Sequence, residues 1–566
     1  MKLAKRLFAL ALCAALLLTV CPALAAEGEL TTVTVLGYNQ GNARMAYFED
    51  SYAYAWLKDK MTEMGIDLQI KYVEADQYKT TITTRLATGT DLADMMFLEV
   101  DNVTLNNLIT RGMLTSVDEI LQYSDGTAAK FLAEDGEYSI LRKSGTGADG
   151  TFWVLQGALA GEFDIKGYNN TYSVGIRQDW LDKLGLPMPT TIDEFVDTLI
   201  AFREQDANGD GIQNEKALFA TDLTLLKHSG IAGWYGLLLN SIGLDPNTDQ
   251  ITTVFYQDGF PEYVKFVRRL VDAGVLSLAD QGSLYTTDTA SLISQNVIGA
   301  MYYQTQAFDT RDDLTGDENC LYTPIALQGV ENVFPTCRGD YALTVYNGYY
   351  AFMNTVDKQA AAKLLDFFFS PEYWRWNRNG LEGNDFEFDE NGNFKSLISG
   401  MSNDEVLAAK LGGGRFYMDR AVLPCLDIAR TYETFNGENV GTFESVEALR
   451  ASEYGKHQLE LANEKDPTGH YAELVVMNWD ALEQKNATMF QTNVNTYLAL
   501  PTDEEVEILS EYSADLETAM NDLFVELIRG DREIEDLEAG LEELRELGLD
   551  EVIGVYQSRY NRFKGE

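Results

Sequence analysis

The chain has 566 residues, more than the roughly 250–300 at which one hydrophobic core stops growing, so we expect two large lobes. Hydrophobic residues make up 45% of the sequence and aromatic residues 11%, which excludes a largely disordered chain. The formal net charge of −46 disfavours binding to nucleic acid or to an anionic lipid surface, and it suits a protein that works outside the cell.

The first 25 residues have the features of a secretory signal peptide. Basic residues lie within positions 2–6, an apolar run covers 7–20, and the small-residue pattern Ala-Leu-Ala ends the segment at Ala25. The apolar run is shorter than the roughly 20 residues that span a bilayer, which argues against a transmembrane anchor. We therefore expect cleavage after Ala25 and a secreted protein of the cell envelope.

The cysteines leave two questions open. Cys21 stands where a lipoprotein signal would carry its lipid, but the preceding Val20 is branched where such signals need a small residue, so a lipid anchor is the less favoured alternative. Beyond the signal segment, Cys320, Cys337 and Cys425 permit at most one disulfide. Cys320 and Cys337 are the pair nearest in sequence, and three buried free thiols are the alternative.

The mature chain begins with alternating strand and helix patterns. Period-2 alternation or a short buried apolar run predicts strands, and apolar residues at helical spacing predict helices. In chain order these are strand 32–36, helix 52–64, strand 68–72, helix 77–87, strand 94–98 and helix 105–110. Strands that alternate with helices imply a parallel sheet with right-handed crossovers.

A second α/β region begins near Phe152. Thr191 and Glu194 form a predicted capping box, which opens an apolar helical stripe over 192–200. The other predicted elements are strand 173–176, helix 263–271, strand 297–303, and helices 358–369 and 503–528. No internal repeat or low-complexity linker separates the regions, so we expect two lobes joined by short crossings.

Six segments, spread from about a third of the way along the chain to its end, carry a family resemblance. They are residues 177–195 (RQDWLDKLGLPMPTTIDEF), 206–211 (DANGDG), 365–372 (LDFFFSPE), 379–384 (NGLEGN), 528–531 (IRGD) and 556–562 (YQSRYNR). Together they resemble motifs of the extracellular solute-binding protein family 1 of ABC importers. Any one of them alone would be a weak signal.

The resemblance implies a two-lobed α/β fold of the type II periplasmic-binding-protein class, with a ligand cleft between the lobes. We expect lobe 1 to comprise 26–157 and 300–368, and lobe 2 to comprise 158–299 and 369–566. The implied function is capture of a small polar solute, an oligosaccharide, and its delivery by hinge closure to the permease subunits of an ABC importer. We expect a monomer without catalytic activity.

Two other functions stay open at this point: a secreted glycan-active hydrolase, and a chemosensory or scaffold protein that binds but does not transport. The hydrolase reading has little support in the motifs. The three histidines show no zinc spacing, and no GxSxG, phosphate loop or dinucleotide fingerprint occurs in a suitable context. Carboxylates are so abundant that pairs suited to glycoside hydrolysis arise by chance.

The segment 206–215 begins like an EF-hand calcium loop. Oxygen-bearing side chains fall at positions 1, 3 and 5, and a glycine at position 6 allows the turn. Position 12 is Ala217, so the usual bidentate glutamate is missing. The predicted calcium ligands are Asp206, Asn208, Asp210, Asn214, Glu215 and the backbone carbonyl of Ile212. A solvated turn without metal is the alternative.

The candidate ligand contacts come from two arguments. Residues that directly follow parallel strands lie at the sheet edge where α/β folds bind ligands, and aromatic rings offer faces on which sugars stack. The candidate ligand-binding residues are Tyr38, Asn39, Glu99, Asp101, Trp153, Gln156, Trp234, Tyr303 and Glu382. The alternative is ordinary loop polarity for the polar residues and core packing for the tryptophans.

Overall fold

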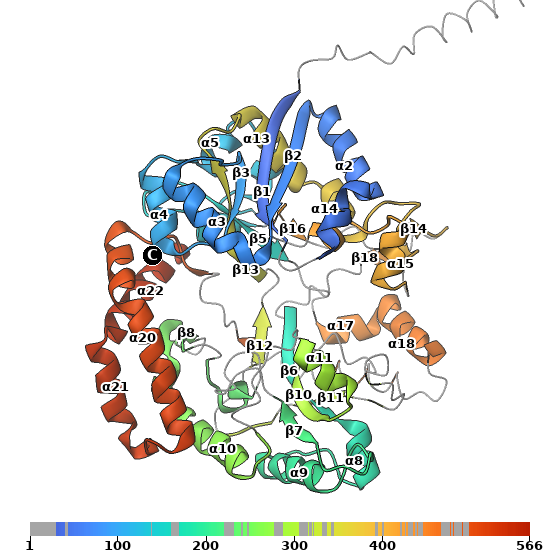
Figure 1. Cartoon of the computed structure of the whole chain (residues 1–566), viewed down its shortest axis with the longest axis vertical. Coiled ribbons are helices and arrows are strands. Elements are labelled where there is room, and N and C mark those ends of the chain that lie inside the picture. The colour runs from blue at the N-terminus through green and yellow to red at the C-terminus, as the bar shows by residue number, and fades with distance from the viewer. Residues whose placement is uncertain are drawn as a thin grey trace, which may run out of the picture.

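A computed structural model of the chain contains two bodies, which lie one above the other in Figure 1. The structure describes residues 30–39, 43–136, 138–159, 169–219, 231–238, 241–245, 248–276, 287–304, 315, 320, 322–325, 327–330, 337–340, 344–390, 394–398, 401–418, 422–424, 426–427, 434–435, 438–439, 445–465, 472, 476, 479, 489–490 and 497–566. The predicted signal peptide and Cys21 lie outside this range. Within it, no helix is long and apolar enough to cross a bilayer.

The first lobe is built on a seven-stranded sheet with the order β16-β5-β13-β3-β1-β2, and β4 pairs with β13. β1 is parallel to both β2 and β3, as the alternating pattern predicts, whereas β13 runs antiparallel to β3 and β5. The strands are β1 (Thr31–Tyr38), β2 (Ile66–Val73), β3 (Met95–Leu98), β4 (Leu114–Thr115), β5 (Leu155–Leu159), β13 (Thr344–Met353) and β16 (Leu426–Asp427).

Helices cover this sheet, and their starts follow from the local sequence. Ser51 caps α2 by accepting a hydrogen bond from the Tyr54 amide at 3.0 Å, and apolar residues at helical spacing, including Leu57 and Met61, face the core. The helices of this lobe are η1 (Ala43–Asp50), α2 (Tyr52–Glu63), α3 (Ala75–Thr88), α4 (Asn102–Thr110), α5 (Val117–Leu121), α6 (Thr127–Phe131), α7 (Ser139–Gly145), α13 (Lys358–Phe368), α14 (Pro371–Asn379), α15 (Asn403–Ala408) and α16 (Gly414–Met418).

The second lobe is built on a six-stranded sheet with the order β19-β12-β6-β10-β7, and β11 pairs with β6. The predicted capping box at the start of α9 is confirmed, since the Thr191 hydroxyl accepts from the Glu194 amide at 3.2 Å. The strands are β6 (Asn169–Arg177), β7 (Lys216–Phe219), β10 (Ile298–Gln304), β11 (Tyr322–Ile325), β12 (Cys337–Asp340) and β19 (Met489–Phe490). The helices around it are α8 (Gln178–Leu184), α9 (Ile192–Glu204), η2 (Ala232–Tyr235), η3 (Val254–Tyr256), α10 (Phe260–Asp272) and α11 (Thr287–Ser294).

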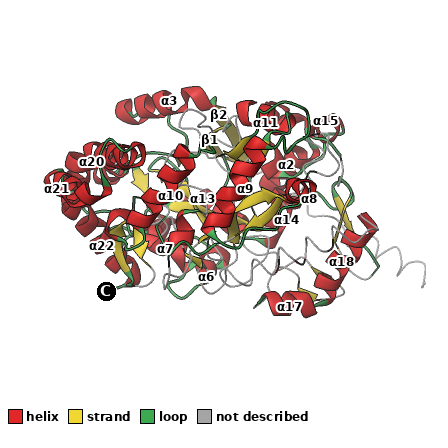
Figure 2. Cartoon of the chain, turned by 90° about the horizontal axis from the view of Figure 1, so that it is seen from below, coloured by secondary structure: helices red, strands yellow, loops and turns green. Residues whose placement is uncertain are grey.

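The last helices lie along one side of both bodies, coloured red in Figure 1, and they form one edge of the molecule in Figure 2. They are α20 (Asp503–Arg529), η6 (Ile534–Asp536), α21 (Leu537–Glu546) and α22 (Leu549–Lys564). The remaining elements are the hairpins β8 (Ile242–Asp245)–β9 (Gln250–Thr253), β14 (Phe386–Phe388)–β15 (Phe394–Ser396) and β17 (Thr434–Phe435)–β18 (Glu438–Asn439), with helices α17 (Val446–Ala451) and α18 (Glu453–Lys465).

Each lobe has its own hydrophobic core, and the division differs from the boundaries predicted from the sequence. The first core draws on residues 33–155 and 350–423, together with Leu500. The second draws on 174–327 and 509–555. The chain therefore returns to the first lobe at β13, not at residue 300, because β10 pairs with β6 and β7 in the second sheet. The chain also stays in the first lobe beyond residue 368, since the first core includes residues up to 423.

Among the described residues, the chain passes between the lobes from β5 to β6, from β12 to β13, from β16 to β19, from β19 to Leu500 and from Leu500 into α20. At Leu500 the backbone amide donates to the Thr146 carbonyl of the first lobe at 3.0 Å. Asn106 on α4 donates to Asp503 at the start of α20 at 2.5 Å. Cys320 is buried. The side chain of Cys337 and the whole of Cys425 lie outside the described part of the chain, so the pairing of Cys320 with Cys337 stays a prediction.

Candidate ligand-binding site

The carboxyl ends of β1 and β3 bring the candidate residues Tyr38 and Glu99 together. The Tyr38 hydroxyl donates to Glu99 Oε2 at 2.8 Å. Tyr78 supports the pair, because its ring lies 4.2 Å from that of Tyr38 and its hydroxyl accepts from the Glu99 amide at 3.1 Å. Burial raises the pKa of Tyr78, so its hydroxyl keeps the proton with which it bonds to the Phe97 carbonyl.

The neighbouring Asn39 is held by a carboxylate that the sequence analysis did not select. Its side-chain amide donates to Glu74, and its Oδ1 accepts from the Ala75 amide at 3.1 Å. Glu74 follows β2 directly, so the rule that selected Asn39 after β1 would also have found Glu74. Asp101 has a different task, since it caps α4 by accepting from the Thr104 amide at 2.7 Å.

Trp153 and Gln156 precede the first passage between the lobes. Trp153 is half-buried and packs against the first core. Gln156, on β5, is buried at 5% exposure, and its side-chain oxygen Oε1 has no hydrogen-bond partner among the residues that the structure describes. A buried acceptor without a donor is rare in folded proteins and marks a place where a further group has to be considered.

The remaining three candidates are not gathered with these. Trp234 is 3% exposed and packs edge-on to Phe195 with ring centroids 5.2 Å apart, so it belongs to the core of the second lobe. Tyr303 lies on β10 opposite Ser173 in the backbone ladder. Glu382 is exposed in the turn that bridges to Phe386. Burial of the Trp234 ring leaves it no free face for stacking.

The loop 206–215 is organised by its own side chains. Asp206 accepts from the amides of Gly209 and Gly211, both at 3.1 Å, and Gly211 adopts a φ of +84°, which glycine tolerates best. Asn208 accepts from the Asp210 amide at 3.0 Å, and Asp210 accepts from the Ile212 amide at 2.7 Å. The side-chain oxygens thus converge on one compact turn.

Glu215 completes this loop in an unusual state. It is 6% exposed, and within the described part of the chain neither of its carboxylate oxygens has a hydrogen-bond partner. Among the described residues, no group of three or more His, Cys, Asp or Glu side chains is placed to hold a metal ion. A site here would therefore need the amide oxygens of Asn208 and Asn214 and the Ile212 carbonyl, as the sequence analysis expected.

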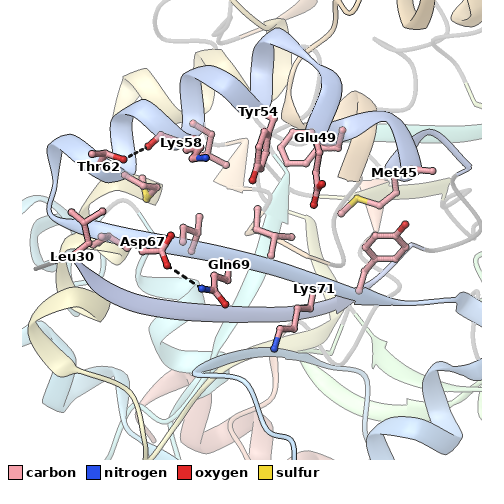
Figure 3. A pocket seen from close by; sticks show the side chains of 17 residues that line it. Leu30, Met45, Glu49, Tyr54, Lys58, Thr62, Asp67, Gln69 and Lys71 are labelled. Atoms are coloured by element: carbon pink, nitrogen blue, oxygen red, sulfur yellow. Dashed lines mark hydrogen bonds between the residues drawn. The ribbon is translucent and has the colours of Figure 1, made fainter.

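A groove of about 510 Å³ lies between α2, η1 and the edge strand β2 (Figure 3). Tyr54 and Glu49 point into it from the helical side, and Leu57 and Met61 contribute to its apolar wall. On the strand, Gln69 donates to Asp67 at 3.0 Å. No sequence pattern indicates this groove, because it arises only when a helix packs against the outermost strand.

Comparison with known proteins identifies relatives of this chain. The family model of bacterial extracellular solute-binding proteins matches residues 46–373. The fructooligosaccharide ABC transporter substrate-binding protein FusA of Streptococcus pneumoniae is 27% identical over 195 residues, which cover 33% of this chain and 35% of that protein. The match therefore spans about a third of that relative's length.

Solved structures extend the likeness over nearly the whole chain. An HMO-binding solute-binding protein associated with an ABC transporter, from Bifidobacterium longum infantis, superimposes with a TM-score of 0.66 at 17% identity, covering 95% of this chain and 99% of that one. An EF-hand mutant of S. pneumoniae FusA in complex with fructo-nystose gives a TM-score of 0.63 at 18% identity, covering 94% and 100%. These likenesses establish the two-lobed fold of type II solute-binding proteins, and the family match covers more than half of the sequence. The chain belongs to the bacterial extracellular solute-binding protein family.

Proposed function

We propose that this protein captures an oligosaccharide outside the cell and delivers it to the permease subunits of an ABC importer. The observation that carries the proposal is the family match over 46–373 on a fold with two separate cores. The relative's name, a fructooligosaccharide substrate-binding protein, supports a carbohydrate as the class of ligand. An exported protein fits this function, with cleavage after Ala25 and a lipid on Cys21 as the less favoured route to the membrane.

The polar edge of the first sheet supplies the chemistry for such a ligand. Tyr38, Asn39, Glu74 and Glu99 form two hydrogen-bonded pairs there, and each pair keeps acceptor capacity for sugar hydroxyl groups. Trp153, half-buried near the first passage, is the aromatic residue we assign to stacking. Ligand that contacts both lobes only when they approach would shift the protein towards the closed arrangement. No observation favours turnover of the bound sugar.

The decisive experiment is mass spectrometry of whatever is released from protein purified under native conditions, followed by titration calorimetry with the released compound. We expect an oligosaccharide, and we expect the same compound to be recovered unchanged after long incubation. Recovery of a peptide or another polar solute would overturn the carbohydrate assignment. Cleavage products would instead support a hydrolase.

We also propose that the loop 206–215 holds a structural calcium ion. The support is Glu215, a buried carboxylate whose two oxygens lack donors. Calcium takes six to eight oxygen ligands at about 2.3–2.6 Å, and carboxylate, amide and backbone carbonyl oxygens all serve as such ligands. Asp206, Asn208, Asp210 and Asn214 would provide further oxygens. The ion would stabilise the fold of this loop and would not contact the captured solute.

The metal is tested by thermal unfolding with and without chelator. Calcium at a hundredfold excess over its Kd is expected to add about 2.7 kcal/mol to the free energy of unfolding. Asp206→Ala should abolish the difference, whereas Asp101→Ala, which removes a carboxylate from a helix cap in the other lobe, should leave it intact. Identical melting curves with and without chelator would remove the calcium proposal.

A further inference from the structure

Two buried polar atoms near the passages between the lobes lack partners, and they are chemically complementary. One is Oε1 of Gln156, a hydrogen-bond acceptor on β5. The other is Nη1 of Arg559, a charged donor on α22. The two residues are 5% and 3% exposed. The hydrogen bond that Arg559 does make is from Nε to the Ala499 carbonyl at 2.8 Å.

Tyr349 on β13 places the two groups on the same side of the first sheet. It lies directly opposite Gln156 in the antiparallel ladder, so their side chains share one face. Tyr349 also interacts electrostatically with Arg559, whose guanidinium lies 5.8 Å from the Tyr556 ring. Gln156 and Arg559 are therefore both neighbours of one tyrosine.

The two residues lie where the two bodies meet. Gln156 belongs to the sheet of the first lobe and comes shortly before the passage to β6. Arg559 is on α22, which packs into the core of the second lobe through residues such as Val552 and Val555, and its side chain bonds to Ala499, next to Leu500 of the first core. Arg559 therefore links the second lobe to the passage into α20, and a change in the angle between the lobes would alter its position relative to Gln156.

Glu505, an acidic group that interacts electrostatically with Arg559, is already engaged. Glu505, at the start of α20, accepts two hydrogen bonds from Arg562, at 2.7 and 2.5 Å. Both oxygens of Glu505 are thus bound to Arg562, and no hydrogen bond joins Glu505 to Arg559. The unpaired atoms are buried, so bulk solvent does not reach them. Buried donors and acceptors are normally paired, and their lack of partners destabilises the arrangement in which it occurs.

We propose that Gln156 and Arg559 form a hinge latch: they are positioning residues that hydrogen-bond to each other, Nη1 to Oε1, in a second arrangement of the lobes. The latch stabilises that second arrangement, and it thereby sets how often the lobes adopt it before any solute binds. The proposal rests on the two-lobed closure of the proposed function. It assigns a task to the C-terminal YQSRYNR segment, which solute capture alone leaves unexplained.

The test is the distribution of distances between the lobes in the ligand-free full-length protein. Spin labels on bioorthogonal residues at the exposed positions Asp59 of α2 and Asp272 of α10 report this distance by pulsed electron paramagnetic resonance. Gln156→Glu would turn the latch into an ion pair, and we expect the second arrangement to gain about tenfold relative to the first, as for one buried hydrogen bond to a charged group. Gln156→Leu should shift the ratio in the opposite direction.

Two further variants make the test specific. In a Gln156→Glu, Arg559→Met double variant, the tenfold gain should disappear. Gln122→Glu, an equal change of charge on an exposed glutamine of the same lobe, should leave the distances unchanged. If Arg559→Met does not fold, Arg559→Lys serves as the partner variant, and it should retain only part of the gain.

The latch is overturned if both substitutions at Gln156 shift the distances in the same direction or not at all, or if the effect of Gln156→Glu persists without Arg559. A merely structural role would change the melting temperature and leave the distances as they are. This outcome is independent of solute capture, which is decided by the compound released from the native protein. The two experiments can therefore show that the protein captures an oligosaccharide but has no latch, or that it has a latch but captures no oligosaccharide.

Discussion

The polar edge of the first sheet and Glu215 in the second lobe differ in whether hydrogen-bond partners are present. At the sheet edge Tyr38 is bonded to Glu99, and Asn39 is bonded to Glu74. Glu215 is buried, yet its carboxylate lacks a donor within the described part of the chain. Side chains that are hydrogen-bonded to one another are held in place before a ligand arrives. A buried polar group without a partner indicates that an ion binds there or that a movement of the protein supplies the partner.

The largest effect is expected for Trp234, a candidate binding residue that lies in the hydrophobic core of the second lobe. Trp234→Ala should lower the free energy of unfolding by about 3–5 kcal/mol, because it leaves a cavity beside Phe195. The affinity of the remaining folded molecules for the natively released solute should stay the same. Chemical denaturation and calorimetry measure the two quantities. The matched Trp153→Ala variant should behave in the reverse way, with at least a thirtyfold loss of affinity, as for a binding hot spot of about 2 kcal/mol.

A second prediction concerns the unpaired carboxylate. Glu215→Gln should cost most of the roughly 2.7 kcal/mol that calcium contributes at a hundredfold excess over its Kd. In chelator the sign should reverse, because the amide is neutral and burying an unpaired charge is unfavourable. Melting curves of parent and variant should therefore cross over between the two conditions. A variant that is less stable in both would show that Glu215 is a packing residue and not a calcium ligand.

The hydrogen bond between Tyr38 and Glu99 at the sheet edge is tested by removing the Tyr38 hydroxyl. Tyr38→Phe keeps the ring contact with Tyr78 but deletes the bond to Glu99. We expect about a tenfold weaker Kd for the released solute, since Glu99 loses the hydrogen bond that orients it, and little change in melting temperature. Titration calorimetry at constant salt measures this. An unchanged Kd would mean that Glu99 is not orientated by Tyr38 for binding.

The smallest effect is expected for the residue at this edge that caps a helix. Asp101→Ala should lower stability by about 1 kcal/mol through loss of the bond to the Thr104 amide. Asp101→Asn should recover most of that loss, because asparagine is an equally good cap. Neither variant should alter solute affinity. A matching loss of solute affinity in both variants would show instead that Asp101 belongs to the binding site.

Sequence patterns predicted the parts of the molecule that depend on neighbours in the chain. The strand and helix periods and the capping box at Thr191 are local features, and the structure confirms them. The pairing of Tyr38 with Glu99 was also within reach, because residues that follow adjacent parallel strands meet at one edge. The return of the chain to the first lobe was misplaced because an apolar strand at 297–303 fits either sheet by its pattern alone.

The remaining features depend on contacts that no local pattern records. Trp234 was selected because its ring could stack on a sugar, and only packing against Phe195 reveals it as core. Gln156 and Arg559 come from opposite parts of the sequence, and their relation depends on which atoms lack partners after folding. Glu215 was selected for its position in a loop, but its burial could not be read from that position.

The outermost place of β2 in its sheet also bears on how the protein behaves when concentrated. A strand at the end of a sheet presents backbone groups that can pair with a second molecule and begin aggregation. In β2, Asp67, Gln69 and Lys71 alternate with the apolar Leu68 and Ile70 along the strand. Charged side chains on such a strand oppose edge-to-edge pairing. Replacing Asp67 and Lys71 by valine would therefore be expected to lower colloidal solubility long before it affects the fold.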